Sequence, residues 1–138
     1  MRLRKEYRWE MGHRLPDHDG GCRNLHGHSY RLEIILDGEV GANGMVVDFN
    51  DISRIVKPMI AELDHAFMVD RADTPVMEFL ETQALKTVIV DFPSTVENLC
   101  RYFTDRVWPA MEPYPNVDAL TVRIFETPNS AAEHRVER

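Results

Sequence analysis

Residues 26–36 read HGHSYRLEIIL, and this stretch decides how the first half of the chain folds. Successive side chains of a β-strand point to opposite faces, so His26 and His28 share one face with Tyr30, and the residues that follow keep the alternation. The pattern predicts a half-buried strand whose apolar face ends in two imidazoles, about 6.5 to 7 Å apart along the chain.

A third histidine comes into phase at the end of residues 3–13, which repeat this alternation. Trp9 and Met11 precede His13 on one face, and charged residues occupy the other face. Two adjacent strands of this kind would bring the three histidines to one end of a buried surface, with Cys22 in the intervening loop. Zinc prefers nitrogen and sulfur donors, and three protein ligands with an open fourth position are typical of catalytic zinc sites. The sequence therefore predicts a zinc site made by the three histidines.

The composition indicates one domain that spans residues 1–138. With 43% hydrophobic residues the chain can build a core without disulfides, and two cysteines with no long apolar run predict a cytoplasmic protein that does not enter membranes. The net charge of −7 argues against a nucleic-acid partner. Residues 1–31 nevertheless hold seven Arg or Lys and four Asp or Glu, and this local charge of +3 could accept an anionic substrate.

Two long helices are predicted in the rest of the chain. Asp48 or Asn50 caps the first, whose apolar stripe covers residues 52–63 and includes Pro58. The second helix opens at residues 94–97, Ser-Thr-Val-Glu, which have the form of a capping box.

Shorter strands are predicted beside these helices. Residues 88–90 suggest a brief strand, residues 120–124 alternate as a half-buried strand, and a last short strand follows Ala132. Residues 66–86 fit no single pattern, apart from a short helix after Pro75. The chain therefore reads as an α+β domain without internal repeats.

Two polar features stand out against this background. Glu126 continues the apolar face of residues 120–124, so its carboxylate needs either a cationic or donor-rich ligand edge or a solvent-facing strand end. Asp64 and His65 close the first helix, where a histidine can interact with the helix macrodipole. Asp64 could instead fix the tautomer of a catalytic His65.

Six motifs resemble the 6-pyruvoyltetrahydropterin synthase / 6-carboxytetrahydropterin synthase family and run in order along nearly the whole chain. They are HRLP at 13–16, CRNLHGH at 22–28, GMVVDF at 44–49, LDH at 63–65, STVEN at 94–98 and FET at 125–127. The short cysteine-to-histidine spacing and the GMVVDF segment are more similar to the bacterial 6-carboxytetrahydropterin synthases of queuosine (7-deazaguanine) biosynthesis than to the animal pyruvoyl enzymes.

The resemblance implies a tunnelling fold (T-fold), which is an antiparallel β-sheet with two helices on one face. In this family the sheets of several subunits close around a threefold axis into a barrel. The implied assembly is a homohexamer of two stacked trimers, with active sites between subunits.

The resemblance also implies roles for individual residues. His13, His26 and His28 would bind zinc. Cys22, Asp64 and His65 would transfer protons, and Glu126 with Thr95 would bind the pterin ring. Arg14 and Arg23 are candidates for contacting a triphosphate by charge and proximity alone. Residues 134–138 differ from the ending of many relatives, so no role is carried over to them.

The implied activity is that of a zinc-dependent lyase, which converts 7,8-dihydroneopterin triphosphate to 6-carboxytetrahydropterin, acetaldehyde and triphosphate. One alternative within the enzyme class makes 6-pyruvoyltetrahydropterin and leaves the side chain uncleaved. An alternative of another class is a non-enzymatic domain, in which Cys22 closes a structural zinc site as the fourth ligand to the histidines.

Overall fold

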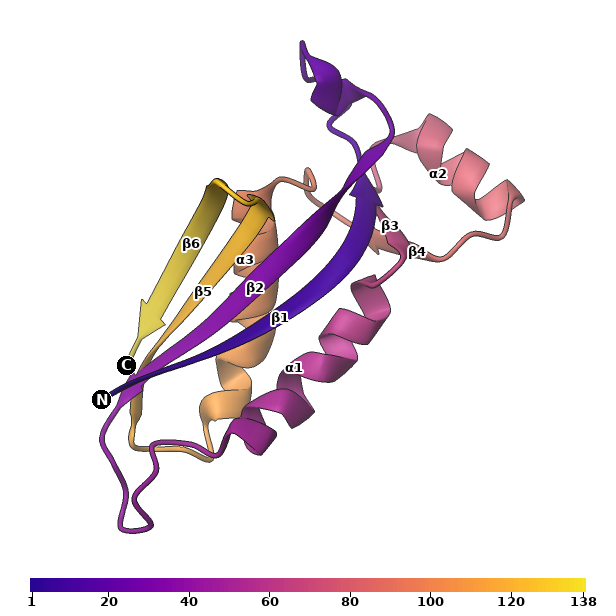
Figure 1. Ribbon diagram of the computed structural model, residues 1–138. Helices are drawn as coiled ribbons and strands as arrows, with labels where there is room; N and C mark the ends of the chain where they lie inside the picture. The colour runs from indigo at the N-terminus through magenta and orange to yellow at the C-terminus, as the bar shows by residue number, and fades with distance from the viewer.

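The computed structural model describes residues 1–138 as one curled six-stranded sheet with three α-helices (Figure 1). The elements in chain order are β1 (Arg2–His13), the 3-10 turn η1 (Gly21–Arg23), β2 (His26–Gly38), α1 (Phe49–Leu63), β3 (Ala66–Asp70), α2 (Thr74–Thr82), β4 (Thr87–Val90), α3 (Val96–Val107), η2 (Pro109–Met111), β5 (Val117–Thr127) and β6 (Ser130–Glu137). The predicted strands and both long helices are therefore confirmed, with the final strand beginning slightly earlier than predicted.

The strands lie in the order β4-β3-β1-β2-β5-β6. Strands β1, β2, β5 and β6 pair antiparallel in this order, as predicted. Strand β3 pairs parallel with β1, and β4 pairs parallel with β3. The sheet is thus mixed rather than wholly antiparallel. The sequence pattern predicted the strand at residues 88–90 but revealed neither β3 nor the parallel pairing, because these strands have only five and four residues and show no clear alternation.

Two helices cover one face of the sheet (Figure 1). Helix α1 contacts β1 and β3, and helix α3 contacts β5 and β6. The third helix, α2, lies beside the short strands and contains Pro75 in its first turn, so the short helix predicted there is confirmed. None of the helices combines the length and apolarity that crossing a bilayer requires.

The caps of the two long helices differ in how well they were predicted. Asp48 caps α1 by accepting the N–H of Asn50, and the helix continues through Pro58. Helix α3 is capped by Thr95, which accepts the N–H of Asn98 at 3.3 Å, and not by the preceding serine of the capping-box motif. The predicted start of the helix is therefore confirmed, but the cap is the second hydroxyl residue of the motif, and the serine is free for another contact.

The core lies between the sheet and the two covering helices. Trp9 and Tyr30, on adjacent strands, stack with ring centroids 4.9 Å apart, and Phe103 of α3 packs against them. The in-phase residues next to the histidines on both strands are thus buried, which confirms the predicted orientation of these strands. The helix-free face is covered by charged side chains, and its one buried charge is Glu33.

Candidate metal and catalytic site

The three in-phase histidines converge where β1 and β2 meet the loop between them. His13 lies directly opposite His26 in the antiparallel pairing, and Met11 lies opposite His28. The ligand nitrogens of the three histidines all lie within 4.8 Å of one another, and these residues form the histidine cluster. The cluster is buried at His13 and half-buried at the other two positions. The predicted convergence is therefore present in the fold.

Backbone carbonyls fix the tautomers of two of these imidazoles. His13 Nδ1 lies 2.8 Å from the carbonyl oxygen of Ser94, and His26 Nδ1 lies 2.7 Å from that of Asn24. A carbonyl can only accept, so each Nδ1 carries the hydrogen and each Nε2 presents its lone pair. The Nε2 atoms of His26 and His28 are buried and have no hydrogen-bond partner. Buried nitrogens without partners at one point are what a bound metal ion would satisfy.

The charge state of the cluster suits a metal ion as well. Burial, with a smaller contribution from the neighbouring imidazoles, lowers the pKa of His13 to about 4, although the hydrogen bond that His13 donates to the Ser94 carbonyl opposes this shift. Burial also lowers the pKa of His28. Neutral imidazoles at neutral pH are the form that binds metal. Three nitrogen donors of this kind fit a zinc ion with an open coordination position.

The Glu126 carboxylate faces the cluster from the end of β5. Its Oε1 lies 3.5 Å from Nε2 of both His13 and His28, and its side chain is one-quarter exposed. The Tyr30 hydroxyl lies 3.5 Å from His13 Nε2, and burial, together with the Glu126 charge, raises the pKa of this phenol. Glu126, which continues an apolar strand face in the sequence, thus has its carboxylate next to the histidine cluster.

Two clefts lie next to each other at this end of the sheet and share Glu10, Gly27, His28 and Ser29 in their walls. The His65 cleft, about 640 Å³, is also lined by His26, His65 and Lys86, with exposed apolar side chains that include Phe79. The Glu126 cleft has a volume of about 700 Å³, and most of the residues that line it are polar. Its walls comprise Arg8, Glu10, Gly27, His28, Ser29, Tyr30, Arg31, Phe125, Glu126, Thr127 and Pro128. The two clefts therefore share a wall that β1 and β2 form.

Asp64 and His65 form a side-chain pair at the end of α1. Asp64 Oδ2 lies 3.0 Å from His65 Nδ1, and Asp64 Oδ1 accepts the backbone N–H of Glu10 at 3.0 Å. The Glu10 N–H and then His65 lower the pKa of Asp64. The carboxylate therefore stays ionised and orients the imidazole, which lines the His65 cleft. Adjacency in the sequence left this contact open, and the structure shows it.

Cys22 lies in η1, within the loop that joins the two histidine strands. It is half-buried, and its carbonyl accepts the N–H of Leu15 at 2.8 Å. The group of side chains close enough to share a metal contains the three histidines and not Cys22. The structure therefore does not form the closed site in which this cysteine is the fourth ligand.

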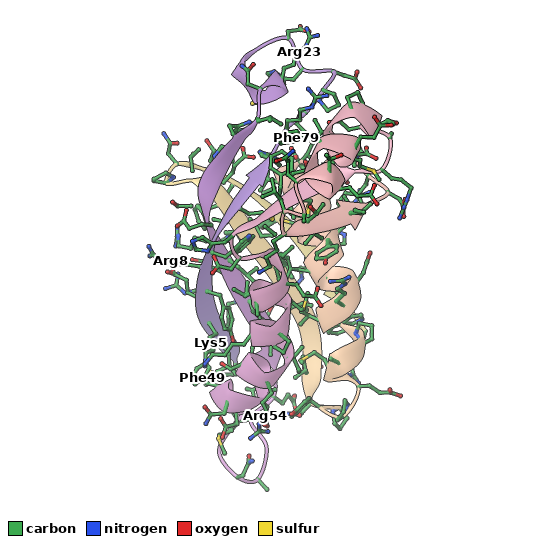
Figure 2. All side chains as sticks on the ribbon, turned by 90° about the vertical axis from the view of Figure 1, so that its right-hand side faces the viewer. Lys5, Arg8, Arg23, Phe49, Arg54 and Phe79 are labelled. Atoms are coloured by element: carbon green, nitrogen blue, oxygen red, sulfur yellow. The ribbon has the colours of Figure 1, made fainter.

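The remaining predicted residues lie outside the walls of both clefts. Arg14 donates two hydrogen bonds of 2.6 Å to buried Asp73, so its guanidinium joins the loop after β1 to the start of α2. Arg23 is exposed at the tip of the loop between β1 and β2 (Figure 2). The Thr95 hydroxyl already serves as the cap of α3. Their predicted contacts with a ligand stay predictions, and Arg14 has a partner that the sequence did not suggest.

Sequence reasoning missed several residues around the site. Ser94 was noticed only as part of a capping-box motif, yet its Oγ lies 3.2 Å from His13 Nδ1, which also contacts the Ser94 carbonyl. Arg8 and Arg31 line the Glu126 cleft, whereas the sequence indicated only a general positive charge over residues 1–31. Lys86 lines the His65 cleft. Two adjacent hydroxyl residues before a helix were the available signal for Ser94, because only one of them can cap.

Comparison with known proteins agrees with this geometry. The family model described as 6-pyruvoyl tetrahydropterin synthase matches residues 2–137. A Haemophilus influenzae protein named 6-carboxy-5,6,7,8-tetrahydropterin synthase is 33% identical, with 98% of this chain and 99% of that protein covered. A protein of the same name from Aquifex aeolicus is 30% identical, with 98% of each chain covered.

Solved structures agree in fold. The 6-pyruvoyl tetrahydropterin synthase of Plasmodium vivax matches with a TM-score of 0.81 at 18% identity, and the match covers 100% of this chain and 98% of that one. The curled sheet with helices on one face is thus the tunnelling fold of these enzymes. With the family model matching almost every residue, the chain belongs to the 6-pyruvoyl tetrahydropterin synthase family.

Proposed function

We propose that this protein is a zinc-dependent 6-carboxy-5,6,7,8-tetrahydropterin synthase. It would convert 7,8-dihydroneopterin triphosphate and one water molecule to 6-carboxytetrahydropterin, acetaldehyde and triphosphate in queuosine (7-deazaguanine) biosynthesis. The observation that carries the proposal is the set of relatives with this name, which match nearly the whole chain. The histidine cluster beside Glu126 and His65 supplies a site at which the reaction could occur.

His13, His26 and His28 would hold the zinc ion through their Nε2 atoms. The carbonyls that accept from Nδ1 of His13 and His26 keep these rings in the orientation and tautomer that binding needs. A bound zinc ion would polarise substrate oxygen atoms and stabilise negative charge that develops on them.

Glu126 would hold the pterin ring. The aminopyrimidinone edge of a pterin presents two N–H donors, which a carboxylate can accept together. Because Glu126 Oε1 lies 3.5 Å from the nitrogens of His13 and His28, this contact would bring the ring beside the histidine cluster. Thr95 is proposed as a further contact to the ring, through a hydroxyl that already caps α3.

Cys22 and His65 would move the protons. In the proposed roles the Cys22 thiolate removes a proton from a side-chain carbon of the substrate, and the His65 imidazole exchanges protons with a side-chain oxygen. Asp64, 3.0 Å from His65 Nδ1, orients that imidazole and stabilises its protonated form. Arg23 and Arg14 are the proposed triphosphate contacts, and Arg14 would use the guanidinium nitrogen that Asp73 leaves unbonded.

Product analysis tests the proposed activity. Zinc-loaded protein incubated with 7,8-dihydroneopterin triphosphate should release acetaldehyde and triphosphate in equal amounts. Triphosphate without acetaldehyde would instead support the alternative 6-pyruvoyl product, which agrees with the description of the family model. Zinc-loaded protein that leaves the substrate intact would contradict both.

The assembly is proposed to be a homohexamer in the cytoplasm. The outer strands β4 and β6 each leave one edge unpaired within the subunit, and pairing with other copies would cover these edges. Light scattering on dilute protein should give the mass of six chains. A fully active monomer would rule out sites that are shared between subunits.

A further inference from the structure

We propose that Lys86 is a positioning residue for His65. Its ammonium group binds the carbonyl of the peptide bond that joins Asp64 to His65, and so it fixes where the His65 imidazole lies in the His65 cleft. This inference rests on the proposed role of His65 in proton transfer. Lys86 lies outside every motif that pointed to the family.

The backbone of His65 is in a conformation that needs to be held. Its φ is +58°, in the left-handed region that side chains other than glycine disfavour by about 1 to 2 kcal/mol. The His65 side chain is 76% exposed, so packing contributes little to keeping it in place. Hydrogen bonds to the neighbouring backbone must therefore maintain this conformation.

Two hydrogen bonds hold the peptide bond between Asp64 and His65, one on each side. The His65 N–H donates to the carbonyl of Glu10 at 2.7 Å, which ties it to β1. On the opposite side, Lys86 Nζ donates to the Asp64 carbonyl at 2.6 Å. Rotation of this peptide bond would break both contacts. The direction of the His65 imidazole thus depends on a strand on one side and on Lys86 on the other.

A lysine suits the end of α1 for a second reason. The last carbonyls of a helix lack partners within it, and together they form the negative end of the helix dipole. Lys86 Nζ also donates to the Ala61 carbonyl at 2.7 Å, so one ammonium group binds the last turn of α1 and the peptide bond that follows.

The backbone of Lys86 is itself anchored. Its carbonyl accepts the N–H of Phe67 in β3 at 3.0 Å, immediately before β4 begins. Ala84, two residues earlier, has a φ of +52° in the turn that follows α2. The turn thus brings the lysine back to the end of α1, so that α2 and β4 contribute to the geometry of the site.

Kinetics of two Lys86 variants test whether this lysine positions His65. Lys86→Met keeps the length and removes the donors, and Lys86→Arg restores them. Because a small misplacement of a catalytic group can cost up to about 100-fold, we expect kcat of Lys86→Met to fall roughly 10- to 100-fold with KM and zinc content nearly unchanged. Lys86→Arg should recover most of the loss. An effect of Lys86→Met on KM alone would show that the ammonium contacts the substrate, and would overturn the proposal.

Lys5→Met is the matched control. Lys5 Nζ donates to the carbonyl of Phe49 at 2.9 Å, at the other end of the same helix. Figure 2 shows this pair at the end of the molecule opposite Phe79, which lines the His65 cleft. The control removes a comparable lysine-to-carbonyl contact and should leave kcat unchanged. An equal loss in Lys5→Met would mean that α1 as a whole, and not His65, is affected.

Amide hydrogen exchange supplies a readout that needs no substrate. In zinc-loaded Lys86→Met the His65 N–H should exchange more than about tenfold faster than in the wild type, while amides in the middle of α1 keep their protection. Unchanged His65 protection, or Lys86→Arg exchanging as fast as Lys86→Met, would overturn the proposal. Because this measurement does not depend on turnover, it also decides the question if the protein proves inactive on pterin triphosphates.

Discussion

The two faces of the central strand β2 each bury polar side chains, and they treat them in opposite ways. On the face that carries the core, His26 and His28 bury nitrogens that have no partner. On the helix-free face, Glu33 is 1% exposed, and its two carboxylate oxygens accept from three arginines at 3.0 to 3.1 Å. The arginines are Arg4, Arg31 and Arg123.

The contrast separates polar groups that serve the fold from those that serve a ligand. A buried polar group without a partner costs folding free energy, and a ligand that supplies the partner would recover that cost. Glu33 has all its partners within the chain and needs no ligand. The Nε2 atoms of His26 and His28 lack such partners, which is the physical reason to place the proposed site there.

Removing one histidine should have the largest effect. Loss of a group that only orients a metal ligand already weakens binding about 10- to 100-fold, so His28→Ala, which removes a ligand itself, should cost more than that and abolish turnover. Zinc content after dialysis against a chelator measures this. His18→Ala is the control, because His18 is an exposed histidine outside the cluster. Stoichiometric zinc in His28→Ala would show that the cluster is not the metal site.

Cys22→Ala should reduce turnover and spare the metal. A general acid or base contributes roughly 10²- to 10⁴-fold to the rate, and Cys22 is not part of the histidine cluster. Single-turnover rates and zinc analysis on the same sample separate the two effects. Cys100→Ala is the control, since Cys100 is buried in the core and should affect stability alone. Loss of zinc from Cys22→Ala would revive the closed structural site.

Glu126→Gln should weaken substrate binding without unfolding the protein. A hydrogen bond to a charged group contributes roughly 1.5 to 3 kcal/mol, so affinity for the pterin should fall about 10- to 100-fold, with zinc retained. Titration of zinc-loaded Cys22→Ala protein, with and without Glu126→Gln, measures binding in the absence of turnover. Equal affinities would remove Glu126 from the pterin site.

The same contrast explains what could be predicted from the sequence. The histidine cluster was predictable because strand parity alone aligns His13, His26 and His28, and the pairing of adjacent strands does the rest. Glu126 was found for the same reason, as a charge in phase with an apolar face. Such patterns are local, and a single strand or helix carries each of them.

The features that escaped prediction depend on contacts between distant segments. The parallel strands β3 and β4 become part of the sheet only by pairing with β1 and with each other. Arg14 meets Asp73 across 59 positions, and Lys86 reaches Asp64 across 22. Ser94 could be assigned to His13 only once the fold had shown that Thr95 caps the helix. No periodicity marks such contacts in a single sequence.

Glu33→Met should destabilise the fold and leave ligand binding intact. The variant leaves three arginines without their shared partner, but their side chains are 27 to 62% exposed and water can solvate them. We therefore expect a loss of about 1 to 3 kcal/mol in the free energy of unfolding, less than for a fully buried pair. Urea titration measures it. Glu137→Met, on the same face with a 69% exposed side chain, should change stability by less than about 0.5 kcal/mol.

The two faces should also respond to acid in different pH windows. Burial lowers the pKa of His13 from 6.5 to about 4, so between these values the unfolded chain binds more protons than the folded one. This contribution to the stability of zinc-free protein is fully present above pH 6.5 and is lost as the pH falls toward 4. On the helix-free face, Arg2 and Arg135 lower the pKa of Asp37 below its usual 3.8, so that contribution disappears only in stronger acid.

Urea unfolding of zinc-free protein at a series of pH values can separate these windows. Wild-type stability should fall gradually from pH 6.5 to 4, and His13→Gln should have a shallower slope there because one of the buried imidazoles is gone. Asp37→Asn should leave that slope unchanged and alter only the behaviour below about pH 4, since its carboxylate titrates there. A wild-type stability that is flat between pH 4 and 6.5 would mean that the histidines gain protons as easily in the fold as in the unfolded chain. The cluster would then be open to water, and its nitrogens would not be the unpaired buried groups that distinguish it from Glu33.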